Sequence, residues 1–228
     1  MSENEVQKLK NIKNELETTE MYDKSNPMTD LLCSIFGVIL PAVPIIKEGL
    51  DISINKFQEK KKRQFCDIIL SDTSHITSDK VQDISFIIEL SRTIDVINRL
   101  AQNDKVAFIA RLFKKEFIDT DEYNIDQYEE YLHRLDYLSL KEINILIDLY
   151  LYSQKNGKEY HAEWYEFKQL AATRYNVTED EIASVFAGLT RTGFCRESNM
   201  IFPSNKEIEN PIYVTEYFKK FAEMILEL

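Results

Sequence analysis

Glycine and proline are scarce in this chain, with only 5 of each among 228 residues. Many-stranded sandwiches and βαβ folds need frequent turn residues, so this scarcity argues against both classes. Hydrophobic residues make up 44% of the chain and charged residues 29%, which is a globular composition. We therefore predict a mainly α-helical protein with short connections, long enough for one large domain or two of ordinary size.

Cysteine and histidine are also scarce, with 3 of each. The cysteines lack a CxxC spacing, and the histidines form no HExxH or comparable metal-binding motif. Gly188 and Gly193 are the nearest approach to a phosphate loop, but no Lys-Ser/Thr follows them and they close a helical pattern. We expect no metal, no cofactor and no catalysis, and we interpret the cysteines as core thiols in a reducing compartment.

Acidic residues outnumber basic ones, with 39 Asp and Glu against 28 Lys and Arg and a net charge of −11. This field repels phosphate polyanions, so binding to a nucleic acid would require a local basic patch. The first residues of the sequence are acidic and polar and do not have the pattern of a secretory leader. The sequence therefore favours the cytoplasm, with a peripheral position at a membrane as the alternative.

Residues 1–138 carry apolar residues at helical spacing, which predicts a helical bundle. One long helix is expected from Ser78 to Ala101, with Asn103 as the cap of the next helix and a further helix over residues 128–135. The apolar positions that mark the long helix are Val81, Ile84, Ile88, Ile94 and Ile97. Short polar links between these helices favour antiparallel neighbours.

The most unusual stretch of this region is uncharged and runs from Leu31 to Ile46, LLCSIFGVILPAVPII. As a helix it would span about 24 Å, less than the ~30 Å of a bilayer core, and Pro41 and Pro44 would interrupt it. We interpret it as a buried element of the core; the alternative is a segment that lies in or inserts into a membrane.

A basic cluster follows the apolar stretch and would suit anionic lipid headgroups. Its members are Lys56, Lys60, Lys61, Lys62 and Arg63. A solvated helix face explains the same residues, because apolar side chains between and after them can form a buried stripe. The pattern therefore leaves both readings open.

Residues 139–228 form a second predicted module, in which two capping boxes open helices, Ser139 with Glu142 and Thr178 with Glu181. A helix between them is defined by Trp164, Phe167, Leu170 and Ala171 and ends at Tyr175, and the helix after Thr178 is expected to bury Ile182, Val185, Phe186 and Leu189. Gly193 is expected at the end of this helix in the left-handed conformation. Short strand-like runs follow at residues 194–196, 200–202 and 212–214, and a last helix begins after Thr215.

The order of helix, helix, turn, helix, polar loop and last helix resembles the winged-helix domain of MarR-type and PadR-type bacterial regulators. The resemblance covers about 90 residues and rests on Leu189-Thr190-Arg191-Thr192-Gly193-Phe194 and Tyr213-Val214-Thr215-Glu216. It implies that the helix from Thr178 to Thr192 would enter the major groove of DNA. The loop from Pro203 to Asn210 would be the wing.

The sequence departs from the DNA-binding version where contact would occur. The presumed reading helix begins with Glu179, Asp180 and Glu181, and the wing carries Lys206 beside two glutamates. The module holds 14 acidic and 10 basic residues, so it is net acidic. These charges disfavour DNA and favour a winged helix that docks proteins.

We predict a non-enzymatic bacterial regulatory or adaptor protein that binds a protein partner or a second copy of itself. The alternatives are a DNA-binding regulator and a membrane-acting effector in phage defence; the second follows from a faint similarity of the region from Leu31 to Gly49 to bacterial abortive-infection proteins. Trp164 and Tyr165 are the candidate protein-recognition residues. The DNA reading would need the basic residues of the module on one exposed face, namely Lys168, Arg174, Arg191 and Arg196, with Lys206 in the wing.

Overall fold

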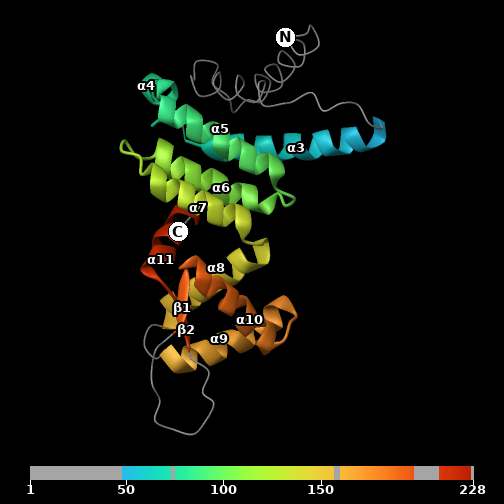
Figure 1. The fold of residues 1–228 in the computed structure, drawn as a ribbon, viewed down its shortest axis with the longest axis vertical. Helices are drawn as coiled ribbons and strands as arrows, with labels where there is room; N and C mark the ends of the chain where they lie inside the picture. The colour runs from blue at the N-terminus through green and yellow to red at the C-terminus, as the bar shows by residue number, and fades with distance from the viewer. Residues whose placement is uncertain (1–47, 73–74, 157–159, 198–210, 227–228) are drawn as a thin grey trace. The chain divides into compact units, whose positions relative to one another are not determined.

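The computed structural model describes residues 48–72, 75–156, 160–197 and 211–226, which are mainly helical (Figure 1). The chain divides into two compact units, residues 1–132 and residues 133–228, and the boundary falls within helix α7. The predicted apolar segment Leu31–Ile46, the expected strand at residues 200–202 and the wing with Lys206 lie outside the described residues.

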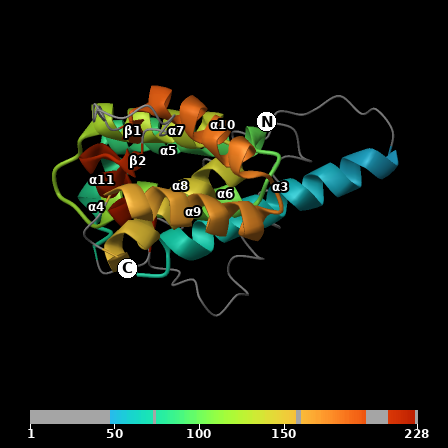
Figure 2. The ribbon, with the colours of Figure 1, turned by 90° about the horizontal axis from the view of Figure 1, so that it is seen from below.

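The N-terminal unit is built from helices that pack around α3 and α6. Its elements are α3 (Glu48–Ile69), α4 (Ser78–Gln82), α5 (Ile84–Arg99), α6 (Asp104–Phe113), a π-helical turn (Lys114–Ile118) and the first part of α7 (Ile125–Tyr137). Helix α3 contacts both α5 and α6, and its whole length can be followed in Figure 2. The described part of this unit is thus helical, as predicted.

Aromatic side chains from five elements form the core of the N-terminal unit. Phe113 stacks on Phe117 with ring centroids 4.9 Å apart, and Phe86 meets the edge of Phe113 at 5.4 Å. Phe65 and Tyr128 complete the cluster at 6.0 and 6.1 Å from Phe113, and all five rings are buried. Such edge-to-face contacts add to the free energy gained by removing the rings from water.

The predicted helix from Ser78 to Ala101 is wrong in one respect, because Asp83 divides it. Asp83 is both the last cap of α4 and the first cap of α5, and its carboxylate accepts hydrogen bonds from the backbone N–H groups of Ser85 and Phe86. The break turns α5, so that Ile84 and Ile88 are 68% and 43% exposed. The buried face of α5 is instead made by Phe86, Leu90, Thr93, Ile94 and Ile97.

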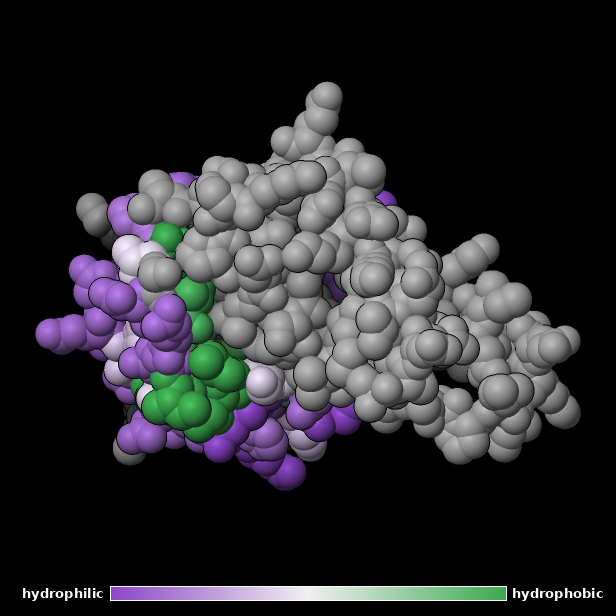
Figure 3. All heavy atoms as spheres, turned by 90° about the horizontal axis from the view of Figure 1, so that it is seen from above, coloured by the Kyte–Doolittle hydropathy of each residue, from purple (hydrophilic) through white to green (hydrophobic). Residues whose placement is uncertain are grey.

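Hydrophobic surface is therefore present on α5. Figure 3 shows a hydrophobic patch among hydrophilic residues on the face that it draws, and the exposed isoleucines of α5 are large apolar residues at the surface of this unit.

The structure also differs from the sequence prediction at Asn103. It occupies the cap position of α6 as expected, but its side chain makes no capping hydrogen bond.

Lys61 corrects the predicted basic cluster, because its side chain is 0% exposed. Its Nζ donates hydrogen bonds to the carbonyl oxygens of Ile97, Asn98 and Leu100 at 2.7, 3.2 and 2.9 Å. These carbonyls end α5, where backbone acceptors lack partners within the helix and where the helix dipole favours a cation. Burial, and to a lesser extent the charge of Lys62, lowers the pKa of Lys61.

The other members of the basic cluster are less enclosed than Lys61. Lys60 and Arg63 are exposed, Lys62 is half-buried, and the side chain of Lys56 lies outside the described part. The four described residues therefore do not form one continuous basic patch, since the ammonium group of Lys61 is buried and hydrogen-bonded inside the unit.

Two buried carboxylates flank the hydroxyl of Tyr128. Glu89 is paired with Arg92 at 2.6 Å, and Arg92 also contacts Glu129. Glu116, in the π-helical turn, accepts a hydrogen bond from the backbone N–H of Asn124. Burial raises the pKa of both carboxyl groups, and the charge of Arg92 partly offsets this at Glu89.

The described part of the C-terminal unit contains the predicted helices and strands at two of the three predicted strand-like runs. After the end of α7 come α8 (Leu140–Asn156), α9 (Tyr160–Tyr175), α10 (Glu179–Leu189), a 3-10 turn (Thr190–Thr192), strands β1 (Cys195–Glu197) and β2 (Ile212–Val214), and α11 (Glu216–Ile225). The strands pair antiparallel, with Cys195 opposite Val214. Gly193 has a φ of 76°, in the left-handed region, and Thr215 caps α11 by accepting from the backbone N–H of Phe218.

Both expected capping boxes are present. The backbone N–H of Ser139 donates to Glu142 at 2.7 Å while that of Glu142 donates to the Ser139 hydroxyl at 3.2 Å, and Thr178 and Glu181 make the same reciprocal pair. Ile182 and Phe186 are buried, as predicted, and Val185 is half-buried. In the described part of the chain, none of the helices combines the length and apolar character needed to cross a bilayer.

The role of Lys61 predicts the effect of its replacement. Lys61→Met keeps a long apolar side chain but removes the hydrogen bonds of the ammonium to the three carbonyls that end α5, so we expect the free energy of unfolding to fall by about 3 kcal/mol. Chemical denaturation measures the change. The exposed Lys60 is the matched control: Lys60→Met should change stability by less than about 0.5 kcal/mol, and equal losses for both variants would contradict the assignment.

Glu89 predicts a dependence of stability on pH. Because its pKa is raised in the folded chain, its favourable contribution is complete below the unfolded pKa of about 4.3 and is lost as the pH rises through the folded pKa. Glu89→Gln remains neutral, so the stability of this variant relative to the wild type should increase as the pH rises from below about 4.3 towards neutral. Urea unfolding across this range tests it, with the exposed Glu122→Gln as control; parallel curves for Glu89→Gln and wild type would refute it.

Candidate interaction surface of the C-terminal unit

The turn between α9 and α10 is a Schellman motif closed by Asn176. The backbone N–H of Val177 donates to the Ala172 carbonyl at 3.0 Å, and that of Asn176 donates to the Thr173 carbonyl at 3.3 Å. Asn176 has a φ of 52°, a left-handed conformation that asparagine tolerates better than most residues. Thr178 then caps α10, so two residues, Asn176 and Val177, separate the last residue of α9 from the cap of α10.

Aromatic contacts hold α10 against α9. Trp164 meets the edge of Phe186 with ring centroids 5.1 Å apart, and Phe167 meets it at 6.0 Å. Trp164 is 1% exposed. Its indole therefore belongs to the core of this unit and not to a surface recognition patch, because it lies at the position that packs against α10.

Lys168 also lies inside the unit. It is buried, its Nζ is 4.0 Å from a carboxylate oxygen of Glu179, and it lies 5.1 Å from the ring centroid of Tyr165. Tyr165 is exposed. The first carboxylate of α10 is thus matched by a cation from α9, and this cation is withdrawn from the surface.

The remaining basic candidates serve different elements. Arg174 donates to Asp148 of α8 at 2.7 Å, on a different side of α9 from Lys168 because the two are six residues apart. Arg191 is exposed after the end of α10, and Arg196 is exposed on β1 with its guanidinium 4.8 Å from the ring centroid of Tyr213. Lys168 and Arg174, the two basic candidates on α9, therefore do not contribute to one basic face.

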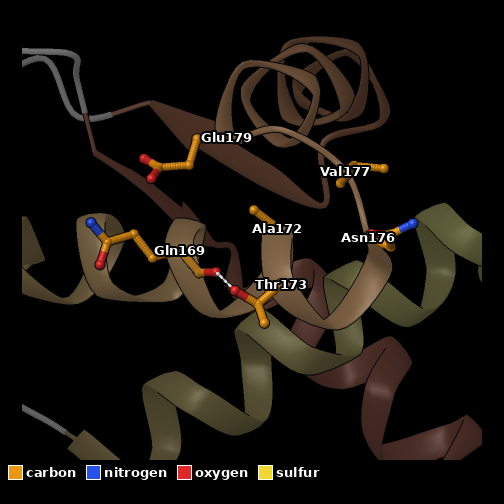
Figure 4. A pocket seen from close by; sticks show the side chains of 6 residues that line it. All are labelled: Gln169, Ala172, Thr173, Asn176, Val177 and Glu179. Carbon is orange, nitrogen blue, oxygen red and sulfur yellow. Dashed lines mark hydrogen bonds between the residues drawn. The ribbon is translucent and has the colours of Figure 1, made fainter.

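A shallow hollow of about 610 Å³ lies at the turn (Figure 4). It is open to solvent and is lined by Gln169, Ala172, Thr173, Asn176, Val177 and Glu179. The Thr173 hydroxyl donates to the Gln169 carbonyl of its own helix at 3.0 Å, as drawn in Figure 4. Amide, hydroxyl and carboxylate groups of this kind can take up polar side chains, and they do not form a nucleophile and base pair.

Two leucines that the sequence did not single out as surface residues are exposed on α8 and α9. Leu151 is 37% exposed and Leu170 57% exposed, although the apolar spacing of α9 had placed Leu170 with the residues that define its buried side. Leu170 lies between Glu166 and Arg174, four residues away on either side. This flanking charge was the signal in the sequence, because a charged row on a helix indicates its solvated face.

Hydrogen bonds join the two charged ends of the row Glu166, Leu170 and Arg174 to α8. The Tyr152 hydroxyl donates to Glu166 at 2.8 Å, and Asp148 accepts from Arg174 and from the Tyr175 hydroxyl, the latter at 2.6 Å. Helices α8 and α9 lie side by side (Figure 2). Leu151 and Leu170 are the exposed apolar residues between these two links.

Among the described residues, no group of three or more His, Cys, Asp or Glu side chains is placed to hold a metal ion. Comparisons of the chain with protein-family models, curated proteins and solved structures found no match. The chemistry of the surface itself must therefore carry the functional argument.

The left-handed turn makes a stability prediction. Asn176→Ala places a β-carbon in a conformation that disfavours it without the compensation that asparagine offers, and should lower the free energy of unfolding by about 1 kcal/mol. Asn176→Gly adopts the same φ freely and should leave stability within about 0.5 kcal/mol of wild type. Thermal and urea unfolding of the pair measure the difference. An alanine variant as stable as the glycine variant would show that the turn carries no such constraint.

Proposed function

We propose that this chain is a non-enzymatic regulatory or adaptor protein whose C-terminal unit is a winged-helix module that docks proteins. The order of α8, α9, a tight turn, α10, a two-stranded antiparallel ribbon and α11 supports a winged helix. In this reading α10 would be the reading helix and the ribbon would lead into the wing.

The observation that carries the proposal is the acidic start of α10. Glu179, Asp180 and Glu181 occupy its first turn. Hydrogen bonds from Thr178 lower the pKa of Glu181, so this carboxylate stays ionised at neutral pH. Negative charge stabilises a helix start but opposes the approach of DNA phosphates.

Two of the basic side chains near this helix are paired with carboxylates of the same unit, whereas Arg191 and Arg196 are exposed. Lys168 is buried beside Glu179, and Arg174 is paired with Asp148. The exposed residues Tyr165, Leu151 and Leu170 instead supply aromatic and aliphatic surface on α8 and α9. Aromatic side chains with flanking charges are typical of protein interfaces.

The test uses the full chain in two assays. Fluorescence anisotropy with labelled duplex DNA at low salt should show no binding; binding that weakens linearly on a log–log salt plot would favour the DNA-binding alternative. Affinity purification from the native host should capture a protein partner that Leu170→Asp loses.

The matched control for the purification is Ile84→Asp, which places the same charge at an exposed apolar position of α5. Retention of the partner by Ile84→Asp and its loss by Leu170→Asp would support docking through the C-terminal unit. The reverse pattern would assign docking to the N-terminal unit, and capture by neither wild type nor variant would refute the adaptor function.

A further inference from the structure

We propose that α9 docks against α9 of a second copy of this chain in antiparallel orientation, with Leu170 at the centre. The inference rests on the proposed docking function and names its partner. It starts from three residues on one ridge of α9, since positions four apart lie on the same face of a helix. Glu166, Leu170 and Arg174 form that ridge.

The charges of the ridge are complementary to themselves. When two identical helices cross antiparallel at Leu170, the residue four positions before it faces the residue four positions after it in the other copy. Glu166 of each copy then faces Arg174 of its partner, twice, because the interface of a twofold dimer is isologous. A parallel pairing would place like charges together and would be repulsive.

Both charged side chains can make these contacts without leaving α8. The side chain of Arg174 is 68% exposed, and its bond to Asp148 uses one of the five donors of a guanidinium. Glu166 is exposed and accepts from the Tyr152 hydroxyl through one oxygen, whereas a carboxylate accepts several hydrogen bonds. The links to α8 hold both groups in position, which lowers the entropic cost of pairing.

The apolar part of the contact is small. Leu170 supplies its centre, so we expect the buried area to fall in the lower range of specific interfaces. We therefore expect a reversible dimer whose population rises with concentration. We also expect added salt to weaken it, because exposed ion pairs are screened.

Sedimentation velocity of the full reduced chain, from low micromolar to several hundred micromolar, tests the proposal directly. The wild type should show a monomer–dimer equilibrium. Leu170→Asp should raise the dissociation constant by about tenfold or more. Lys220→Glu, on the exposed side of α11, changes charge away from the ridge and should leave the equilibrium unchanged.

Charge reversal gives a sharper test, because the pairing is reciprocal. Glu166→Arg alone and Arg174→Glu alone each create two like-charge pairs in a homodimer, so each should be monomeric. An equimolar mixture of the two variants restores two opposite-charge pairs and should form a heterodimer. Circular dichroism and thermal unfolding of each variant establish that it is folded before it is scored.

The outcomes separate this inference from the proposed function. A wild type that stays monomeric throughout the range overturns the dimer, and so does a dimer that neither Leu170→Asp nor the charge variants weaken. If the wild type is monomeric and a different protein is captured by wild type but not by Leu170→Asp, docking stands and self-association fails. If the chain neither dimerises nor captures a protein, both proposals fail.

Discussion

The contact of Phe186 with Trp164 and Phe167 determines which side of α9 is available for function. Because the tight turn at Asn176 brings α10 back onto α9 at once, this aromatic contact buries one side of the helix. Asp148 and Tyr152 of α8 hold part of the remaining circumference by hydrogen bonds. The solvent-facing side of α9 includes the row Glu166, Leu170 and Arg174, on which the proposed dimer depends.

Formal charge in this chain is a poor guide to surface potential, because several cations are used internally. The ammonium group of Lys61 donates hydrogen bonds to the carbonyls that end α5, and Lys168 lies beside Glu179 at the start of α10. Lys61 satisfies unpaired backbone carbonyls at the end of a helix, where the dipole favours a cation, whereas Lys168 is paired with a carboxylate at the start of one. A basic residue count therefore overstates the positive surface that a phosphate would meet.

Local chemistry predicted much of the C-terminal unit. Capping at Thr178 and Thr215, and the left-handed Gly193, involve residues within a few positions of each other, so the sequence contains the whole interaction. The break at Asp83 was missed although its cap hydrogen bonds to Ser85 and Phe86 are equally local. The position of Lys61 is a tertiary outcome, because nothing local shows that its side chain reaches the end of α5.

The candidate surface was predicted less well for the same reason. Trp164 and Leu170 are both large and apolar, and spacing on α9 assigned them to one set; the charges that flank Leu170 and the packing of α10 against Trp164 separate the exposed leucine from the buried indole. The carboxylates at the start of α10 disfavour DNA recognition, because they stabilise the helix at the position where DNA recognition would need cations. A module with carboxylates at this position is better suited to bind a protein surface. There, a mixed row such as Glu166, Leu170 and Arg174 can pair with a row of complementary charges.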